Sequence, residues 1–197
     1  MAFDAGSGAA TDDDLLAMYA AGDRAAARVL TGRLLPRVLA YAARLLGGDR
    51  AEAEDVAQEA MLRLWRMAPG WRPGEAKVST WLYRVVTNLC TDRRRGAQRR
   101  AQPMGDDLPD APDGAPGAEV RMVEEARAAA LDAALAALPD RQREAVVLRH
   151  IEGLSNPEIA EVMGVGVEAV ESLTARGKRA LAAALAPRRD ALGYAEG

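Results

Sequence analysis

Apolar residues recur every three or four positions over most of this chain, which is the spacing of a helix that buries one face. In the first hundred residues this pattern predicts four helices, over about Asp12 to Ala21, Ala25 to Leu46, Ala51 to Met67 and Ser79 to Arg95. Thr11 is the expected N-cap of the first helix. Pro36 is expected to break or kink the second helix, because proline lacks the N–H that a helix interior uses.

The same pattern predicts which helix faces turn outward. In the third predicted helix the expected inward stripe comprises Val56, Met61, Leu62 and Trp65. Its expected outward residues are Asp55, Gln58, Glu59, Arg63 and Arg66. The fourth helix stacks Arg84, Asn88 and Asp92 four positions apart and delivers a run of arginines at its C-terminal end.

A second pattern, from Leu138 to Arg179, places small, apolar and turn-forming residues as a helix-turn-helix pair needs them. Ser155 and Asn156 offer N-cap oxygens, and Pro157 follows where its missing N–H costs nothing. Gly164 can take the left-handed conformation that ends this short helix. A tight turn is therefore expected directly after it.

The second helix of the pair is expected to begin at Val167. Its predicted inward residues are Val170, Leu173 and Leu181. The predicted outward residues are Glu168, Glu171, Ser172, Ala175, Arg176 and Arg179. In DNA-binding modules of this kind such a face reads base edges in the major groove. An ordinary helical hairpin is the alternative that the pattern alone leaves open.

Composition favours an all-α fold of two small helical domains. Of 197 residues 49% are hydrophobic and only 4% are aromatic, which suits aliphatic helical bundles rather than sheets. Prolines, glycines and acids crowd one segment near the middle of the chain and rule out a stable helix there. We expect a disordered N-terminus over 1–11, a first domain over 12–100, a flexible acidic Pro/Gly-rich linker over 101–118, a second domain over 119–187 and a tail over 188–197.

The formal net charge of −3 is unexpected for a protein that binds DNA unaided. The charge is unevenly spread, however, because arginines crowd around a single acid, Asp92, at the end of the fourth predicted helix. These arginines are Arg84, Arg93, Arg94, Arg95, Arg99 and Arg100. A local basic patch can contact DNA while the whole chain stays acidic. Low intrinsic affinity would suit a protein that a larger partner delivers to its site.

Several classes of function are disfavoured by what the sequence lacks. Cys90 and His150 are each the only residue of their type, so disulfides and Cys/His zinc sites within one chain are excluded. We find no nucleophile–base–acid set and no phosphate-binding glycine loop, so we expect no enzyme activity, no cofactor and no small-molecule substrate. A cytoplasmic location is expected, because neither a bilayer-spanning apolar run nor a leader-like start is present.

Three segments together carry a resemblance to a known family. The segment from Glu54 to Trp65 resembles region 2.2 of bacterial sigma factors, Ser79 to Arg95 resembles regions 2.3 and 2.4, and Leu138 to Arg179 resembles region 4. Their order, with an acidic linker between them, resembles an extracytoplasmic-function (ECF) sigma factor, group 4 of the sigma-70 family. The resemblance covers nearly everything after Thr11.

The resemblance implies a role for each segment in binding RNA polymerase and promoter DNA. Asp55, Gln58 and Glu59 would bind the beta-prime clamp helices of core RNA polymerase, although an ordinary solvated helix face is the alternative. The minus-10 element would be recognised and melted by regions 2.3 and 2.4. Candidate contacts to the opened strand are Trp71, Arg72, Arg84, Asn88, Arg93, Arg94 and Arg95.

Region 4 would read the minus-35 element through the outward face of its second helix and bind the beta flap with another surface. Many family members carry a basic residue where this chain has Glu171 and Leu173, so its base preference cannot be carried over. Glu171 could accept from a cytosine amino group or repel phosphate and stand aside. Lys178, Arg179, Arg188 and Arg189 would follow the DNA backbone.

The resemblance also implies an anti-sigma factor, in this family often membrane-bound, that holds the protein inactive. The linker would thread toward the polymerase active-site cleft, or serve only as a flexible tether. A free-standing helix-turn-helix regulator that binds its operator as a dimer is the main alternative function. A protein that only sequesters a partner is the third.

Overall fold

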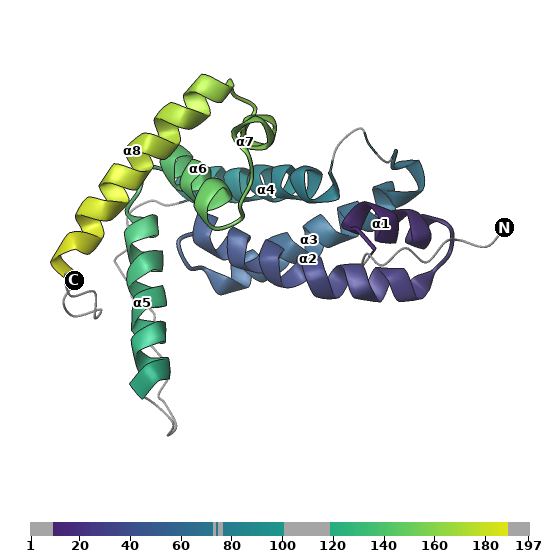
Figure 1. Ribbon diagram of the computed structural model, residues 1–197, viewed down its shortest axis with the longest axis horizontal. Helices are drawn as coiled ribbons and strands as arrows, with labels where there is room; N and C mark the ends of the chain where they lie inside the picture. Colours follow the sequence, from purple (N-terminus) through teal and green to yellow (C-terminus); the bar gives the residue numbers. More distant parts are fainter. Residues whose placement is uncertain (1–9, 73, 75–76, 101–118, 189–197) are drawn as a thin grey trace.

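The computed structural model describes residues 10–72, 74, 77–100 and 119–188, and all regular structure among them is helical. Eight α-helices follow one another through this part of the chain (Figure 1): α1 Asp12–Ala20, α2 Arg24–Leu45, α3 Arg50–Met67, α4 Val78–Arg100, α5 Glu119–Ala136, α6 Asp140–His150, α7 Asn156–Met163 and α8 Val167–Leu185. Two short 3-10 turns cover Ala68–Gly70 and Ala186–Arg188. The predicted all-α fold is confirmed. The expected linker over 101–118 lies outside the described residues.

The helices form two groups, which we call the N-terminal half (α1–α4) and the C-terminal half (α5–α8). In the N-terminal half α2 packs along α3 and α4, and α1 closes one end (Figure 1). Its core includes Leu30, Leu45 and Tyr41, whose hydroxyl lies 2.7 Å from the Thr87 hydroxyl. In the C-terminal half α8 crosses α6 and α7, while α5 extends away from the rest.

Local capping explains where the first helices begin. Thr11 is the N-cap of α1, as predicted, and its side chain accepts a hydrogen bond of 3.1 Å from the backbone N–H of Asp14. The Asp14 carboxylate accepts in return from the Thr11 backbone N–H. Asp23 and Asp49 cap α2 and α3 in the same manner. Each helix therefore starts at a side chain that satisfies its free N–H groups.

Pro36 does not break α2, so of the predicted break or kink the break is wrong. The helix continues through it for 22 residues. The neighbouring turns are held by burial of Leu34 and Val38, which are 2% and 1% exposed. Pro36 itself and Gly32, whose carbonyl loses its helical partner, are both exposed, so water can satisfy that carbonyl. Tertiary packing thus outweighs the local cost of the proline.

The inward stripe of α3 also differs from the prediction at one position. The buried residues of this helix are Ala53, Val56, Ala57, Ala60, Met61 and Leu64. Leu62, predicted to be inward, is 43% exposed because it lies on the opposite side from Leu64. Trp65 is half-buried and packs edge-on against Tyr19, with ring centroids 4.8 Å apart. Small alanines, rather than Leu62, let α3 approach its neighbours.

Candidate nucleic-acid and partner interfaces

The helix-turn-helix pair predicted from the sequence is present as α7 and α8. Ser155 is the N-cap of α7, and its backbone N–H donates to the Glu158 carboxylate at 2.8 Å. Hydrogen bonds from Lys77, then from Ser155, lower the pKa of Glu158 to about 2. Gly164 ends the helix with φ at 63°, and α8 begins three residues later. The local signals in the sequence therefore placed this motif correctly.

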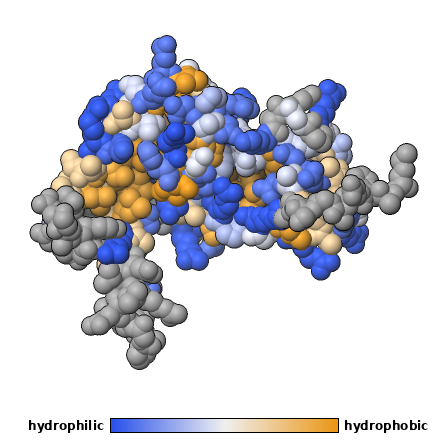
Figure 2. Space-filling model, in the orientation of Figure 1, coloured by the Kyte–Doolittle hydropathy of each residue, from blue (hydrophilic) through white to orange (hydrophobic). Residues whose placement is uncertain are grey.

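The outward face predicted for α8 is open to solvent. Val170 is fully buried, whereas Leu173 and Leu181 are half-buried against the core, which orients the helix as predicted. The exposed side chains are Glu168, Glu171, Ser172, Ala175, Arg176 and Arg179. In Figure 1, α8 runs along the outer edge of the molecule, which leaves this face open apart from a contact with the start of α7. The last turns of α8 carry exposed alanines, and this end of the molecule shows an apolar (orange) surface in Figure 2.

Two contacts orient polar groups on this face. The Asn156 side-chain amide donates to the Glu171 carboxylate at 3.4 Å, which joins the start of α7 to α8. The Arg176 guanidinium donates to the Ser172 carbonyl at 3.3 Å and leaves its other N–H groups available. Glu171 thus has a partner within the motif, which favours the interpretation that it stands aside from DNA over one in which it contacts a base.

Gly177 is a structural residue that the sequence interpretation missed. It is buried where α8 crosses α6, and a Cβ added there would lie 2.6 Å from Cγ2 of Val146 and 3.1 Å from the Gln142 carbonyl oxygen. A glycine in a helix interior usually weakens it, so its presence in the 170, 173, 177, 181 series was the available signal. The crossing holds α8 against the rest of the C-terminal half.

Substitution Gly177→Ala is expected to lower the free energy of unfolding by about 1 to 3 kcal/mol, because the added methyl group overpacks the crossing. Gly32→Ala is the matched control, since Gly32 is also inside a helix but has nothing within 4 Å of an added Cβ. The control should be stabilised by about 0.5 to 1 kcal/mol. Urea unfolding followed by circular dichroism compares them, and equal stabilisation of both would contradict the close crossing.

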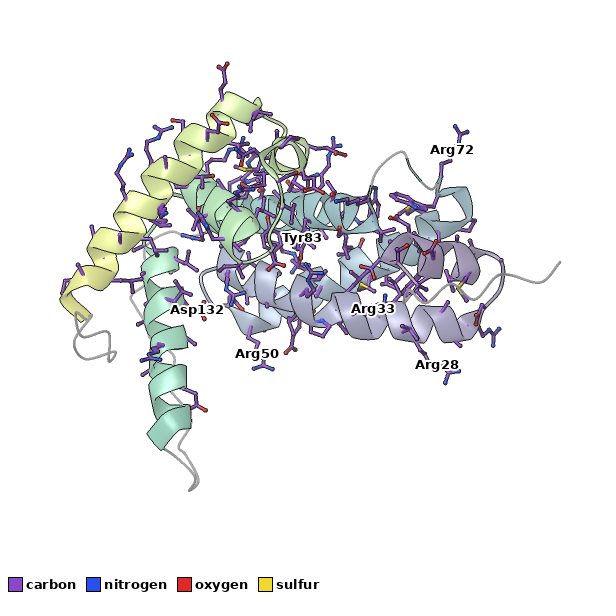
Figure 3. All side chains as sticks on the ribbon, viewed as in Figure 1. Arg28, Arg33, Arg50, Arg72, Tyr83 and Asp132 are labelled. Carbon is purple, nitrogen blue, oxygen red and sulfur yellow. The ribbon has the colours of Figure 1, made fainter. Side chains whose placement is uncertain are left out.

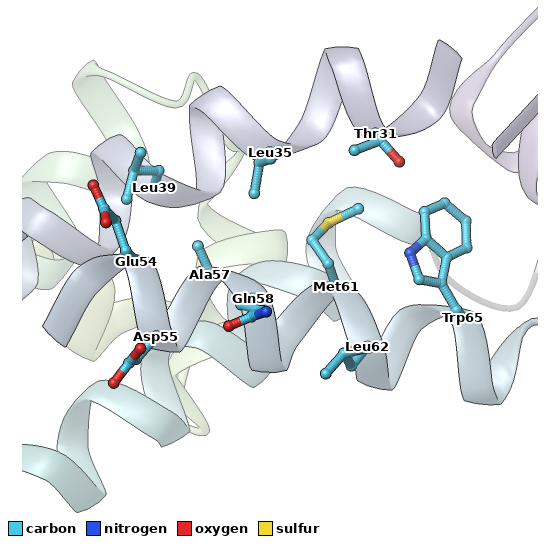
Figure 4. A pocket seen from close by; sticks show the side chains of 10 residues that line it. All are labelled: Thr31, Leu35, Leu39, Glu54, Asp55, Ala57, Gln58, Met61, Leu62 and Trp65. Atoms are coloured by element: carbon cyan, nitrogen blue, oxygen red, sulfur yellow. The ribbon is translucent and has the colours of Figure 1, made fainter. Parts of the chain in front are cut away.

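An apolar groove lies between α2 and α3, on the face that carries the predicted core-binding residues. Its volume is about 460 Å³ (Figure 4), and it is lined by Thr31, Leu35, Leu39, Glu54, Asp55, Ala57, Gln58, Met61, Leu62 and Trp65. Leu35 and Leu62 are 36% and 43% exposed. Asp55 and Gln58 sit at its rim, so two of the three predicted residues border an apolar surface that the sequence interpretation did not foresee.

The third predicted residue, Glu59, faces away from the groove lining. Its carboxylate accepts from Arg63 at 2.8 Å, and this hydrogen bond lowers the pKa of Glu59. Asp55 lies 3.8 Å from Arg93, which also pairs with Glu52. Asp55 nevertheless keeps 69% of its side chain exposed, so it remains accessible to a partner.

The three consecutive arginines at the end of α4 point in three directions, because successive helical residues are rotated by about 100°. Arg93 turns to α3, as described above. Arg94 donates to the Leu45 carbonyl at 3.4 Å, pairs with Asp140 at 3.0 Å and is only 19% exposed. Arg95 is exposed. The structure therefore separates a cluster that looks uniform in the sequence.

The other candidates for minus-10 recognition are also distributed over several surfaces. Arg84 and Asn88 are exposed on one face of α4, as predicted. Trp71 is half-buried against the core, with an indole N–H that has no hydrogen-bond partner. Arg72 is exposed and projects at the far end of the molecule from α8 (Figure 3). Only Arg84, Asn88 and Arg95 form an open polar surface along α4.

Neither a metal site nor a membrane span is found among the described residues. No cluster of three or more His, Cys, Asp or Glu side chains there is arranged to hold a metal ion. None of the described helices is long and apolar enough to cross a membrane.

Two sequence families match this chain. Residues 30–100 match Sigma-70 region 2, and residues 128–181 match Sigma-70, region 4. The ECF RNA polymerase sigma factor SigM of Mycobacterium tuberculosis (strain ATCC 25618 / H37Rv) is 38% identical over 173 residues, covering 87% of this chain and 83% of SigM. This chain belongs to the ECF RNA polymerase sigma factors. As an ECF sigma factor it binds core RNA polymerase and directs promoter-specific initiation.

Two sigma factors of known structure share the fold of this chain. CnrH of Cupriavidus metallidurans is 31% identical over 184 residues, covering 88% of this chain and 94% of CnrH. The structure of CnrH in complex with the cytosolic domain of CnrY superposes with a TM-score of 0.64 over 89% of this chain and 97% of CnrH, at 29% identity. RpoE of Bartonella quintana, solved with the anti-sigma factor NepR, superposes with a TM-score of 0.63 over 81% and 96%, at 21% identity. The family expected from the sequence is confirmed.

Proposed function

We propose that the sigma factor docks on core RNA polymerase through the groove between α2 and α3 and its polar rim. The observation that carries this assignment is the pair of exposed leucines, Leu35 and Leu62, beside Asp55 and Gln58. An apolar groove with a charged rim suits an amphipathic helix, whose apolar side chains fill it while basic residues meet the rim. Glu59 extends the acidic part of this surface.

The promoter contacts are assigned to the exposed faces of α8 and α4. On α8, Ser172 and Arg176 are assigned to base edges of the minus-35 element, and Lys178 and Arg179 to phosphates. On α4, Arg84 and Asn88 with Arg95 are assigned to the opened minus-10 strand. Exposure of these side chains supports the assignment. Chemistry is left to the polymerase, so this chain is proposed to have no catalytic role and to act in the cytoplasm, where its polymerase works.

An anti-sigma factor is the proposed regulator of this protein. CnrH, a relative covering almost the same length, was solved with the cytosolic domain of CnrY. A masking partner needs an accessible apolar surface, and the α2–α3 groove provides one in the free chain. A cytosolic domain of a membrane-bound inhibitor fits this requirement. Competition between that inhibitor and core polymerase for the groove is the proposed mode of control.

Reconstitution with sigma-free core RNA polymerase tests the assignments. The double variant Asp55→Ala, Gln58→Ala is expected to lower core affinity on every promoter. Arg176→Ala should leave core binding intact and cost about 1 to 3 kcal/mol of binding only on promoters that carry the minus-35 element. Glu125→Gln, an exposed acid on α5, is the control and should change neither. Core-affinity loss that depended on the promoter would contradict the docking surface, and unchanged promoter preference would contradict the role of Arg176.

A further inference from the structure

Helix α6 carries three arginines, and each donates hydrogen bonds to carbonyl groups where a neighbouring helix begins or ends. The last carbonyls of an α-helix have no partner within the helix, and the helix dipole makes that end attractive to cations. Arg143 serves the end of α5, through the carbonyls of Leu135, Ala136 and Leu138. The other two arginines serve α7, the first helix of the helix-turn-helix pair.

Arg141 and Arg149, which we call the α6 arginine pair, hold the two ends of α7. The Arg149 guanidinium donates to the Leu154 carbonyl at 3.0 Å, directly before Ser155 caps the helix. The Arg141 guanidinium donates through Nη1 and Nη2 to the carbonyl of Met163, the last residue of α7, at 3.3 Å. A helix of eight residues is too short to be stable by itself. These contacts therefore add to its buried side chains in fixing its orientation.

The turn between α7 and α8 passes the position of α7 on to α8. It runs from Gly164 to Gly166 and starts directly after the carbonyl that Arg141 binds. Gly164 has φ at 63° and ψ at 42°, and the Val165 N–H donates back to the Ala160 carbonyl at 3.1 Å. A connection this short leaves little freedom between the two helices. Displacement of the end of α7 therefore displaces the start of α8.

Farther along, α8 is fixed to α6 at the Gly177 crossing, where Val146 lies against it. Ser172 and Arg176, which are assigned to base edges, lie between this crossing and the turn. The helix rises about 15 Å from Val167 to the crossing, at 1.5 Å per residue. Movement of the turn therefore swings this part of α8 about the crossing. Contacts that read base edges need their donors and acceptors placed within about 0.5 Å.

The α6 arginine pair differs from Arg143 in its exposure. Arg141 keeps 51% of its side chain exposed, and Arg149 is also exposed. Hydrogen bonds near the surface can be replaced by bonds to water, so loss of either arginine should cost little folding free energy. Arg143 is only 7% exposed, and its loss would leave buried carbonyls without partners. The pair is therefore suited to orienting α7 rather than to holding the fold together.

We propose that the α6 arginine pair positions α8 for reading of the minus-35 element without contacting DNA. Arg149 fixes where α7 begins, Arg141 fixes where it ends, and the turn transmits this placement to Ser172 and Arg176. The inference rests on the proposed function for the assignment of α8 to the minus-35 element, but the hold on α7 does not depend on it. Sequence-specific binding thus relies on two side chains outside the DNA-reading face.

Binding of promoter DNA by holoenzyme, assembled from core RNA polymerase and each full-length variant, tests the pair. Arg141→Ala and Arg149→Ala should each weaken binding to a promoter with a minus-35 element at least about fivefold, the effect of one mismatched base pair. Binding to a promoter with a scrambled minus-35 element should change less than about twofold. Arg141→Lys should keep part of the affinity, because lysine retains a donor. Arg28→Ala removes an exposed arginine at the far end of the molecule (Figure 3) and should change neither.

Salt dependence separates positioning from direct contact with phosphate. The slope of log affinity against log salt concentration should keep its wild-type value in both alanine variants, whereas loss of a phosphate contact reduces it by about 1. Arg141→Ala should also be less damaging in an Arg176→Ala background, because a displaced face has already lost that contact. A reduced slope, additive losses or unchanged affinity in both variants would overturn the proposal.

Hydrogen exchange of the backbone amides over 155–167 measures the hold on α7 without DNA. Exchange in the free protein should be at least about fivefold faster in Arg141→Ala and Arg149→Ala than in the wild type, while urea unfolding shows both to be folded. Should Arg141→Ala not fold, Arg149→Ala provides the same measurements at the other end of α7. Wild-type exchange rates would overturn the hold. If Arg176→Ala leaves minus-35 dependence unchanged, the proposed function fails, and faster exchange would still establish the hold.

Discussion

Substitution Leu35→Glu is expected to lower the affinity for core RNA polymerase at least about 30-fold, the effect of losing a 2 kcal/mol contact at the centre of an interface. Leu35 is 36% exposed and lines the α2–α3 groove. A carboxylate there would have to be desolvated when an apolar partner surface fills the groove. Because the side chain is already exposed in the free protein, its own stability should change little.

Val29→Glu is the matched control for this prediction. Val29 is on the same helix and is 47% exposed, but it does not line the groove. Its substitution should leave core affinity within about twofold of the wild type, as expected for a surface position outside an interface. Core affinity is measured by fluorescence anisotropy of labelled sigma factor. Equal losses for both variants would show that charge on α2, rather than the groove, controls binding.

Glu144→Gln is expected to stabilise the protein at neutral and alkaline pH. Glu144 is 1% exposed, and one of its carboxylate oxygens has no hydrogen-bond partner. Burial raises its pKa to about 7 from an ordinary value of 4.5, although Arg141, 3.6 Å away, and Arg94 oppose the rise. A rise of this size corresponds to about 3 kcal/mol of folding free energy that is present below pH 4.5 and lost as the pH rises through 7. Glutamine carries no charge and avoids this loss.

Chemical denaturation at a series of pH values measures the effect. The unfolding free energy of Glu144→Gln should exceed that of the wild type by as much as about 3 kcal/mol at pH 8. The difference should be smallest near pH 4. Glu161→Gln, an exposed acid on the adjacent helix, should follow the wild type across the range. A difference that did not vary with pH would mean that Glu144 has the same pKa in the folded and the unfolded protein.

Features governed by neighbouring residues were predictable from the sequence. Ser155, Pro157 and Gly164 each act through their own backbone groups, so the ends of α7 follow from local rules. The outward face of α8 follows from the helical period of the sequence, because the buried Val170 marks the side of the helix that faces the core. The family followed from the order of three segments, each of which lies mainly within one helix or one helix-turn-helix unit.

Features governed by distant residues were not predictable in this way. Pro36 stays inside a helix because buried neighbours hold it there, and Leu62 lies outward because alanines serve as the close-packed residues of α3. Gly177 matters only because Val146 lies against it. The α2–α3 groove is formed jointly by side chains of two different helices. None of these relations is visible within one helical period of the sequence.

The contacts between the two halves of the protein were the least predictable, because they join residues that lie far apart in the sequence. Glu152 is separated from Tyr83 by 69 positions in the chain, and no local pattern marks either as the partner of the other. Lys77 and Glu158 are separated by 81 positions. Arg94 looked like part of a uniform basic cluster until its pairing with Asp140 was visible. The roles of the remaining DNA-binding candidates stay predictions.

Four ion pairs between described residues join the two halves, and in each the N-terminal half supplies the cation and the C-terminal half the acid, which has a consequence for hybrid proteins. A hybrid that joins the first hundred residues of this chain to the second half of another sigma factor would keep all four cations, Arg37, Arg44, Lys77 and Arg94. Whether such a hybrid keeps these contacts would depend on acids at the positions of Asp132, Asp140, Glu152 and Glu158. Hybrids with identical promoter-reading helices would then differ in how firmly their two halves pack together. Restoring these four acids would be the direct way to restore the contact between the halves.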